Sequence, residues 1–247
     1  GADVFRLNYS HGEPDQKTEL YHRIRAMETE ERTTCILADL PGPKLRLGVF
    51  NGVKLLNNGD KVRLICGKYE HEGDEIPVEY DGLSAELKTG DAILVADGLI
   101  RLSVIQASGE RSSFIDCLVE DGGPVTSRKG INLPGTMIDL PAIGEKDKLA
   151  LDHALKSGAD WIAVSYVRSA EDLRPAKEAV KAAGLHTPII AKIEHPAALN
   201  NLHSILDMAD GVMVARGDLG VEIPLEQVPL AQQKIIDAGL MRGMVVI

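Results

Sequence analysis

The part of the chain from residue 135 onward carries the pattern that most constrains the fold. Short apolar, β-rich runs alternate there with segments whose apolar residues recur at helical spacing. The runs are residues 161–167, 189–193, 212–215 and 245–247. Strands and helices that alternate at such short intervals are typical of right-handed βαβ units and a parallel sheet. Because these strands are apolar throughout, both faces of the sheet are expected to be covered, as in a barrel or a doubly wound fold.

The middle of the chain has a different sequence pattern, of short apolar runs and frequent turn residues. Asn-Gly, Asp-Gly and Gly-Asp turn signals follow one another closely, and short runs such as 61–66, 92–95, 100–105 and 112–119 lie between them. The pattern predicts a small all-β domain inserted into an α/β domain. We expect the α/β domain to be discontinuous. Its two predicted segments are residues 1–46 and 135–247. The insert is predicted at residues 47–134.

Composition narrows the class of protein. A chain of 247 residues is long enough to bury a core without a metal or disulfide. The net charge is −10, with no basic cluster of the kind that duplex binding favours, so a nucleic-acid partner is not expected. No apolar run approaches the length of a membrane span, which argues against a membrane protein. The three cysteines are widely spaced, which indicates packed thiols in a reducing compartment, the cytoplasm.

Five predicted strands of the α/β domain end in polar residues. In a (β/α) barrel, functional side chains come from the carboxyl ends of the strands. The residues at these ends are Arg6, Asn8 and Ser10; Asp39, Lys44 and Arg46; Ser165 and Arg168; Lys192 and Glu194; and Arg216, Gly217 and Asp218. So much charge at converging strand ends predicts a ligand site rather than a core.

The types of charge fit one chemistry. Glu194 and Asp218 are suited to hold one hard cation such as Mg²⁺, whose remaining positions go to water and substrate oxygens. Lys192, Arg6 and Arg46 are suited to phosphate or carboxylate oxygens. A divalent metal and several cations, without an obvious nucleophile or acid–base histidine, indicate phosphoryl transfer.

Five segments that contain these residues resemble the pyruvate kinase family, in the family's order and over essentially the whole chain. They are residues 2–12, 39–46, 129–135, 192–194 and 213–220. The resemblance implies an α/β fold, a (β/α)8 TIM-type barrel that is incomplete here, with an inserted small β-barrel lid. It implies a glycolytic phosphotransferase that converts phosphoenolpyruvate and ADP to pyruvate and ATP. It also implies that Arg46 and Lys129 contact the nucleotide phosphates, and that the β domain closes to exclude water.

The resemblance assigns roles in the barrel. Glu194 and Asp218 would bind Mg²⁺, with Mn²⁺ as an alternative ion. Lys192 would stabilise the transferring phosphoryl group and the developing enolate. Arg6 would contact the phosphate of phosphoenolpyruvate, and the amides around Gly217 and Asp218 would receive its carboxylate.

One departure from the family concerns a monovalent cation. Many members hold K⁺ with Asn, Ser and Asp side chains and the residue after that Asp, often Thr, and carry Glu in the Gly-Pro-Glu segment. Asn8, Ser10 and Asp39 are present, but Leu40 replaces the Thr and Lys44 replaces the Glu. An ammonium group supplies the charge of a bound K⁺, so Lys44 completes the monovalent-cation pocket in this hypothesis. We therefore expect K⁺ not to be required.

A second departure is the extent of the chain. The family's first barrel strand, its last barrel segments and its C-terminal regulatory domain have no counterpart here. A barrel of six strands with an open seam exposes apolar edges. We expect a longer parent chain, of which this stretch is an inactive fragment, and the family suggests a homotetramer.

Two other functions stay open at this point. One is another Mg²⁺-dependent barrel enzyme of phosphoenolpyruvate or pyruvate, such as an aldolase or lyase. The insert with Lys129 argues against it, because carbon–carbon lyases need no nucleotide lid. The other is a non-catalytic binding module, which the missing segments favour and the intact charged residues disfavour.

Several site residues also have ordinary structural interpretations. In these interpretations, Lys192 and Glu194 form a surface ion pair, and Asp218 caps the helix that follows it. Ser165 fits a core hydroxyl, and His195 a helix surface.

Overall fold

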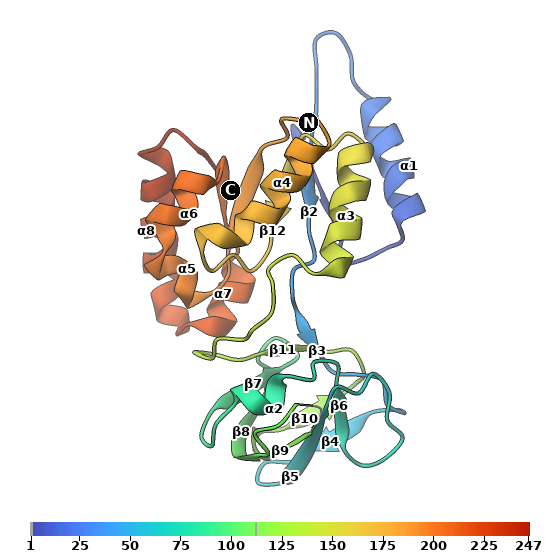
Figure 1. The fold of residues 1–247 in the computed structure, drawn as a ribbon, viewed down its shortest axis with the longest axis vertical. Coiled ribbons are helices and arrows are strands. Elements are labelled where there is room, and N and C mark those ends of the chain that lie inside the picture. Colours follow the sequence, from blue (N-terminus) through green and yellow to red (C-terminus); the bar gives the residue numbers. More distant parts are fainter. Residues whose placement is uncertain (1, 112) are drawn as a thin grey trace. The chain divides into compact units, whose positions relative to one another are not determined.

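The computed structural model describes residues 2–111 and 113–247, which form two compact units (Figure 1). The first comprises the chain up to Pro43, Leu140–Leu219 and Glu226–Ile247. The second comprises Lys44–Asp139 and Gly220–Leu225, and so extends beyond the predicted insert 47–134 at both ends. Within the described ranges, no helix is both long and apolar enough to cross a membrane.

The first unit is built on a six-stranded sheet whose strands are all parallel and lie in chain order. The strands are β1 (Val4–Asn8), β2 (Cys35–Asp39), β12 (Trp161–Val164), β13 (Ile189–Ile193), β14 (Gly211–Val214) and β15 (Val245–Val246). This order confirms the predicted βαβ units and an incomplete barrel of the TIM type.

Helices cover the outer face of this sheet (Figure 1). They are α1 (Pro14–Arg25), α3 (Glu145–Lys156), α4 (Arg174–Ala182), α5 (Pro196–Asn200), α6 (Leu202–Met208) and α8 (Val228–Leu240). Helix α7 (Arg216–Glu222) follows β14, and single 3-10 turns lie at Ala170–Leu173 and Leu225–Gln227. The sheet and these helices enclose the main hydrophobic core.

The alternation of side chains along each strand decides which residues face the barrel interior. Ile36 and Ala38 of β2 pack in the core beneath the helices, whereas Leu37 belongs to a separate small cluster with Ile190 of β13. Successive side chains of a strand point to opposite faces, so residues two apart share a face. The strand residues that share the inner face by this rule are Arg6, Asn8, Asp39 and Lys192.

One predicted strand is shorter than expected. The apolar run 161–167 predicts a single strand, but β12 ends at Val164. The cause is Tyr166, whose φ of 53° lies in the left-handed region and turns the chain out of the sheet. The expectation of a strand to Val167 is therefore wrong, because apolarity reports burial rather than backbone conformation.

The second unit is a closed β-barrel with one short helix. Its elements are β3 (Leu45–Arg46), β4 (Lys54–Leu56), β5 (Lys61–Cys66), β6 (Ile76–Val78), α2 (Leu83–Glu86), β7 (Ala92–Val95), β8 (Ile100–Ala107), β9 (Phe114–Asp121), β10 (Gly123–Val125) and β11 (Gly130–Asn132). Seven strands pair in the order β3-β11-β7-β8-β9-β5-β6, and a bridge between Leu47 and Val78 joins the two ends. Strands β4 and β10 form a separate pair. The predicted run 112–119 begins at a residue outside the described ones, and β9 begins at Phe114.

The thiols inside this second unit are packed, as the spacing of the cysteines predicted. Cys66 and Cys117 are buried and free. Burial raises the pKa of Cys66 to about 11 and that of Cys117 to about 12. Both thiols are therefore protonated at neutral pH and behave as small apolar side chains.

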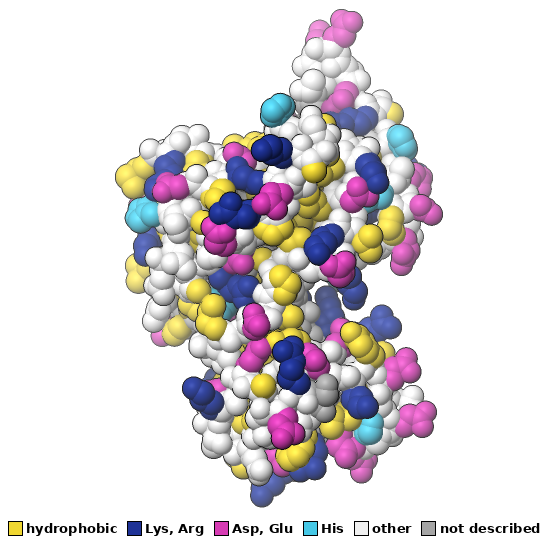
Figure 2. Space-filling model, viewed as in Figure 1, with side chains coloured by type: hydrophobic (Ala, Val, Ile, Leu, Met, Phe, Trp, Pro, Cys, Tyr) yellow, Lys and Arg dark blue, Asp and Glu magenta, His cyan; other side chains and the backbone are white. Residues whose placement is uncertain are grey.

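The surface charge is mixed. On the face seen in Figure 2, basic and acidic side chains are interspersed. Many form exposed ion pairs, such as Arg101 with Glu120 and Lys156 with Asp152. Exposed pairs of this kind contribute little to stability.

Candidate active site

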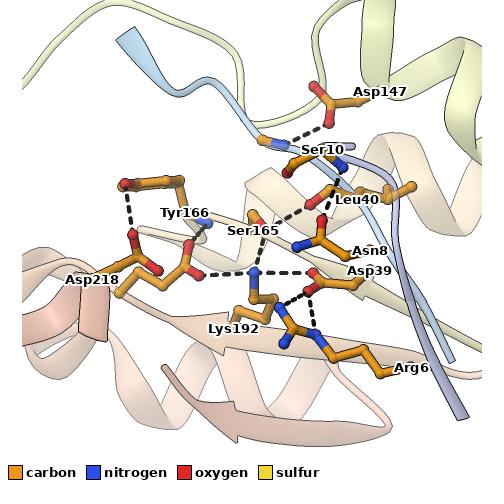
Figure 3. Close-up of polar contacts among 12 residues, drawn as sticks. Arg6, Asn8, Ser10, Asp39, Leu40, Asp147, Ser165, Tyr166, Lys192 and Asp218 are labelled. Atoms are coloured by element: carbon orange, nitrogen blue, oxygen red, sulfur yellow. Dashed lines mark hydrogen bonds and ion pairs between the residues drawn. The ribbon is translucent and has the colours of Figure 1, made fainter. Parts of the chain in front are cut away.

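Lys192 is the centre of a polar cluster at the carboxyl ends of the strands of the first unit (Figure 3). Its Nζ lies 2.9 Å from Asp39 Oδ1 and 2.9 Å from Glu194 Oε1, and donates a hydrogen bond of 2.6 Å to Ser165 Oγ. These partners come from β2 and from the ends of β13 and β12. The parallel register brings residues far apart in sequence to one point.

The Lys192–Glu194 pair is buried, so its interpretation as a surface ion pair is wrong. The two side chains are 9% and 1% exposed. Burial by itself lowers the pKa of Lys192, but Glu194 and Asp39 outweigh it and raise that pKa above its ordinary value. Lys192 is therefore a charged ammonium that is shielded from water, where its field acts strongly.

Asp39 joins Lys192 to Arg6. The guanidinium of Arg6 contacts Asp39 Oδ2 through Nε at 2.7 Å and through Nη2 at 2.5 Å. The Arg6 side chain is still 53% exposed. One edge of the guanidinium is thus fixed by a buried carboxylate while much of the group faces solvent, an arrangement suited to receive an anion.

Tyr166 touches both of the predicted metal ligands, Glu194 and Asp218. The backbone N–H of Tyr166 donates to Glu194 Oε2 at 2.7 Å, and its hydroxyl donates to Asp218 Oδ1 at 3.4 Å. Burial raises the pKa of Glu194, Lys192 lowers it, Asp218 raises it further, and the net direction is upward. A cation between two such carboxylates would relieve their repulsion.

These acids fit a magnesium ion better than a closed metal site. In the part of the chain that the structure describes, no group of three or more His, Cys, Asp or Glu side chains is arranged to hold a metal. The donors available are therefore two carboxylates, both hard oxygen ligands. Mg²⁺ is commonly held by one or two carboxylates while it keeps water and substrate oxygens, so the residues fit that ion.

The ordinary interpretation of Asp218 as a helix cap does not fit its position in the structure. The residue lies within the first turn of α7, which begins at Arg216. The amides of a first turn lack partners inside the helix and favour anions nearby. A Cβ added at Gly217 would meet no atom within 4 Å, so the backbone is open to a close approach there.

Ser165 belongs to the site, although sequence analysis favoured a core hydroxyl. Its hydroxyl accepts from Lys192 and donates to Leu40 O at 2.7 Å. Gly42 lies against it: a Cβ at Gly42 would be 2.6 Å from the Cβ of Ser165. The signal that identifies Ser165 is periodicity, because it follows the inward-facing Ala163 by two residues.

The predicted monovalent-cation residues are already engaged in the structure. Asn8 Oδ1 accepts the backbone N–H of Ser10 at 2.8 Å, and Asp39 pairs with two cationic side chains. A buried lysine that sequence analysis missed, Lys17, donates to Asn8 O at 2.9 Å and to His11 O. Lys17 thus holds the loop after β1.

The remaining predicted cations lie in the second unit, near the β3–β11 pair. Arg46 is opposite Gly130 in that pair. Lys129 directly precedes Gly130 in the sequence and is exposed. Lys44 forms an ion pair with Asp97 at 3.2 Å. A Cβ at Gly130 would lie 2.6 Å from Lys44 Cε, so the lysine stem lies over that glycine.

His195 is not on a helix surface, contrary to the expectation. It is 8% exposed and caps α5, where its ring accepts the N–H of Ala197 at 3.1 Å. Burial, and then the charge of Arg168, lowers its pKa. A buried neutral ring next to Glu194 is structural support for the site rather than part of the surface.

Comparison with known proteins decides the family. The model of the family "Pyruvate kinase, barrel domain" matches residues 1–247. The chain belongs to the pyruvate kinase family. This confirms the assignment from the five segments, and it favours a kinase, a transferase, over the lyase alternative.

Curated pyruvate kinases show the same relationship. A pyruvate kinase of Agrobacterium vitis is 44% identical over 242 residues, which is 96% of this chain and 50% of that protein. Pyruvate kinases of Mycobacterium tuberculosis and Corynebacterium glutamicum are each 43% identical over 238 residues, with the same shares covered. The chain therefore spans about half the length of the curated pyruvate kinases it matches.

Proposed function

We propose that this pyruvate kinase acts in glycolysis in the cytoplasm and transfers the phosphoryl group of phosphoenolpyruvate to ADP, giving pyruvate and ATP. The observation that carries the proposal is the buried ammonium of Lys192, held between Asp39 and Glu194 at the carboxyl ends of the barrel strands. A cation that two carboxylates and a hydroxyl hold in one orientation is preorganised to stabilise negative charge that develops on a substrate.

In the proposed reaction, a terminal phosphate oxygen of ADP attacks the phosphorus of phosphoenolpyruvate. The bond between phosphorus and the enol oxygen breaks, and the enolate left behind takes up a proton to become pyruvate. Negative charge moves onto the transferring oxygens and then onto the enolate. Lys192 is the catalytic group suited to stabilise both, and Arg6 binds the phosphate through its exposed guanidinium.

Glu194 and Asp218 would hold Mg²⁺, or Mn²⁺ in its place. The ion, when bound, supplies positive charge to the phosphate and carboxylate oxygens of the substrate. The open backbone at Gly217 and the first-turn amides of α7 would receive the substrate carboxylate.

The second unit would bind the nucleotide and act as a lid that excludes water. Arg46 and Lys129 are the proposed contacts to the nucleotide phosphates, and their neighbouring positions at the β3–β11 pair support this. Exclusion of water strengthens every electrostatic interaction in the site. The complete protein is proposed to be a homotetramer, as the family suggests.

We further propose that the enzyme works without K⁺. Lys44 stands where relatives of the family carry an acidic residue, so its ammonium would supply the charge of the monovalent ion. Asn8, Ser10 and Asp39 would form the rest of that pocket. The pairing of Asp39 with two cationic side chains supports the view that its charge is balanced internally.

The test of the proposed function is product analysis of the full-length protein with phosphoenolpyruvate and Mg²⁺. We expect pyruvate and ATP to appear in equal amounts, and only when ADP is present. Pyruvate release without ADP, or formation of a new carbon–carbon bond, would point to a lyase or aldolase instead. Binding of oxalate and Mg²⁺ without turnover would indicate a binding module.

A further inference from the structure

Tyr166 has a backbone conformation that a tyrosine rarely adopts. Its φ of 53° lies in the left-handed region, where the Cβ of a residue with a side chain crowds the following carbonyl oxygen. Such strain persists only where surrounding contacts enforce it, and it gathers at functional sites. Here it falls at the point where β12 ends and the chain passes over the polar cluster.

The left-handed turn lets one residue touch both proposed metal ligands. The backbone N–H of Tyr166 donates to Glu194 Oε2 at 2.7 Å. The ring then places its hydroxyl 3.4 Å from Asp218 Oδ1, as Figure 3 shows. Glu194 follows β13 and Asp218 lies in α7, so the residue links two elements that follow different strands.

The two contacts have different consequences for substitution. Any residue other than proline at position 166 retains the backbone N–H and hence a donor for Glu194. The hydroxyl contacts Asp218, so the change from tyrosine to phenylalanine removes that contact and leaves the ring in place. A second hydrogen-bonding partner is the usual means by which a protein orients a carboxylate that binds metal.

We propose that Tyr166 is a positioning residue for the divalent cation, with its hydroxyl holding Asp218 in the orientation that binds the ion. The proposal rests on the proposed function, because it takes Glu194 and Asp218 as the metal ligands. The residue touches neither substrate nor reacting atoms in this scheme. Its effect therefore falls on metal affinity rather than on the chemical step.

The test is direct Mn²⁺ binding to the full-length protein, followed by the electron paramagnetic resonance signal of free Mn²⁺ without substrate. The variants are Tyr166→Phe, Glu194→Gln, and Tyr80→Phe as the matched control. Tyr80 donates its hydroxyl to Glu86 in the second unit, so this control also loses a tyrosine–carboxylate hydrogen bond. We expect Tyr166→Phe to weaken Mn²⁺ binding about 10-fold, the lower end of the range for loss of an outer partner.

Kinetics supply the second readout. Tyr166→Phe should need more Mn²⁺ or Mg²⁺ for half-maximal activity, while kcat at saturating metal stays close to that of the unaltered protein. Tyr80→Phe should change neither quantity. Should Tyr166→Phe be unstable, the rise in melting temperature caused by Mn²⁺ still reports its affinity, because a ligand stabilises the folded state in proportion to its binding.

The outcomes separate this proposal from the proposed function. Equal Mn²⁺ binding in Tyr166→Phe and the unaltered protein, with loss in Glu194→Gln, overturns the role of Tyr166 and leaves the metal assignment intact. Equal binding in all variants overturns the metal assignment itself. A fall in kcat at saturating metal without a change in affinity also overturns the positioning role.

Discussion

Lys192 donates a hydrogen bond of 2.6 Å to the hydroxyl of Ser165, which lies just beyond the end of the neighbouring strand. The hydroxyl in turn donates a hydrogen bond to Leu40 O at 2.7 Å. The ammonium is therefore held by a neutral group as well as by the carboxylates of Asp39 and Glu194. The orientation of the ammonium depends on Asp39 of β2 and on residues that follow β12 and β13. This dependence can be tested.

Replacement of Lys192 by methionine should remove the main positive charge of the site. We expect kcat to fall by about 10²–10³, the usual loss when one electrostatic stabiliser of a transition state is removed. Lys181→Met is the matched control, because Lys181 is exposed on α4. Steady-state kinetics of both variants measure the effect. Near-normal turnover in Lys192→Met would refute its assigned role.

Replacement of Ser165 by alanine should loosen the ammonium without removing its charge. A hydrogen bond to a charged group contributes about 1.5 kcal/mol or more, so we expect kcat to fall about tenfold. Ser84→Ala is the control: Ser84 is a buried serine of the second unit whose hydroxyl bonds Ser108 and Phe114 O. It should lose stability but not activity. An equal fall in kcat for the two variants would mean that Ser165 acts only through stability.

Replacement of Gly42 by alanine should disturb Ser165. The glycine has a φ of +74°, and a Cβ there would lie 2.6 Å from that of Ser165. Gly184→Ala is the control, since its φ of +68° is similar but its surroundings are open. We expect the free energy of unfolding of the control, measured in urea, to fall by about 1 kcal/mol, and its kcat to stay unchanged. Gly42→Ala should lose more stability and also kcat; unchanged turnover would contradict the link to Ser165.

The proposed K⁺ independence predicts full activity in buffer free of K⁺ and Na⁺. Lys44→Glu should remove the built-in charge and make activity depend on added K⁺, because the pocket would then need an external cation. Activity of both proteins is measured against K⁺ concentration. Strong activation of the unaltered enzyme by K⁺ would contradict the hypothesis, as would indifference to K⁺ in an inactive Lys44→Glu protein.

The barrel and most of its site were predictable from local pattern. Apolar runs separated by helical segments predicted parallel strands, and the polar residues at the ends of those runs indicated Lys192 and Glu194. The prediction failed at Trp161–Val167, where an apolar run does not reveal a left-handed residue. It also missed Lys17, because an isolated lysine on a helix gives no sign that its amine is buried against backbone carbonyls.

The amino-acid sequence by itself determined the strand and helix order, the polar strand ends and the family. Those properties follow from periodicity and from motifs within short segments. Only the tertiary structure decided that Ser165 supports Lys192, that Arg6 and Lys192 share Asp39, and that Tyr166 touches both Glu194 and Asp218. These contacts join residues on, or just after, different strands of the sheet. They depend on the register between strands and on one strained φ angle, and neither is encoded in any single segment of the chain.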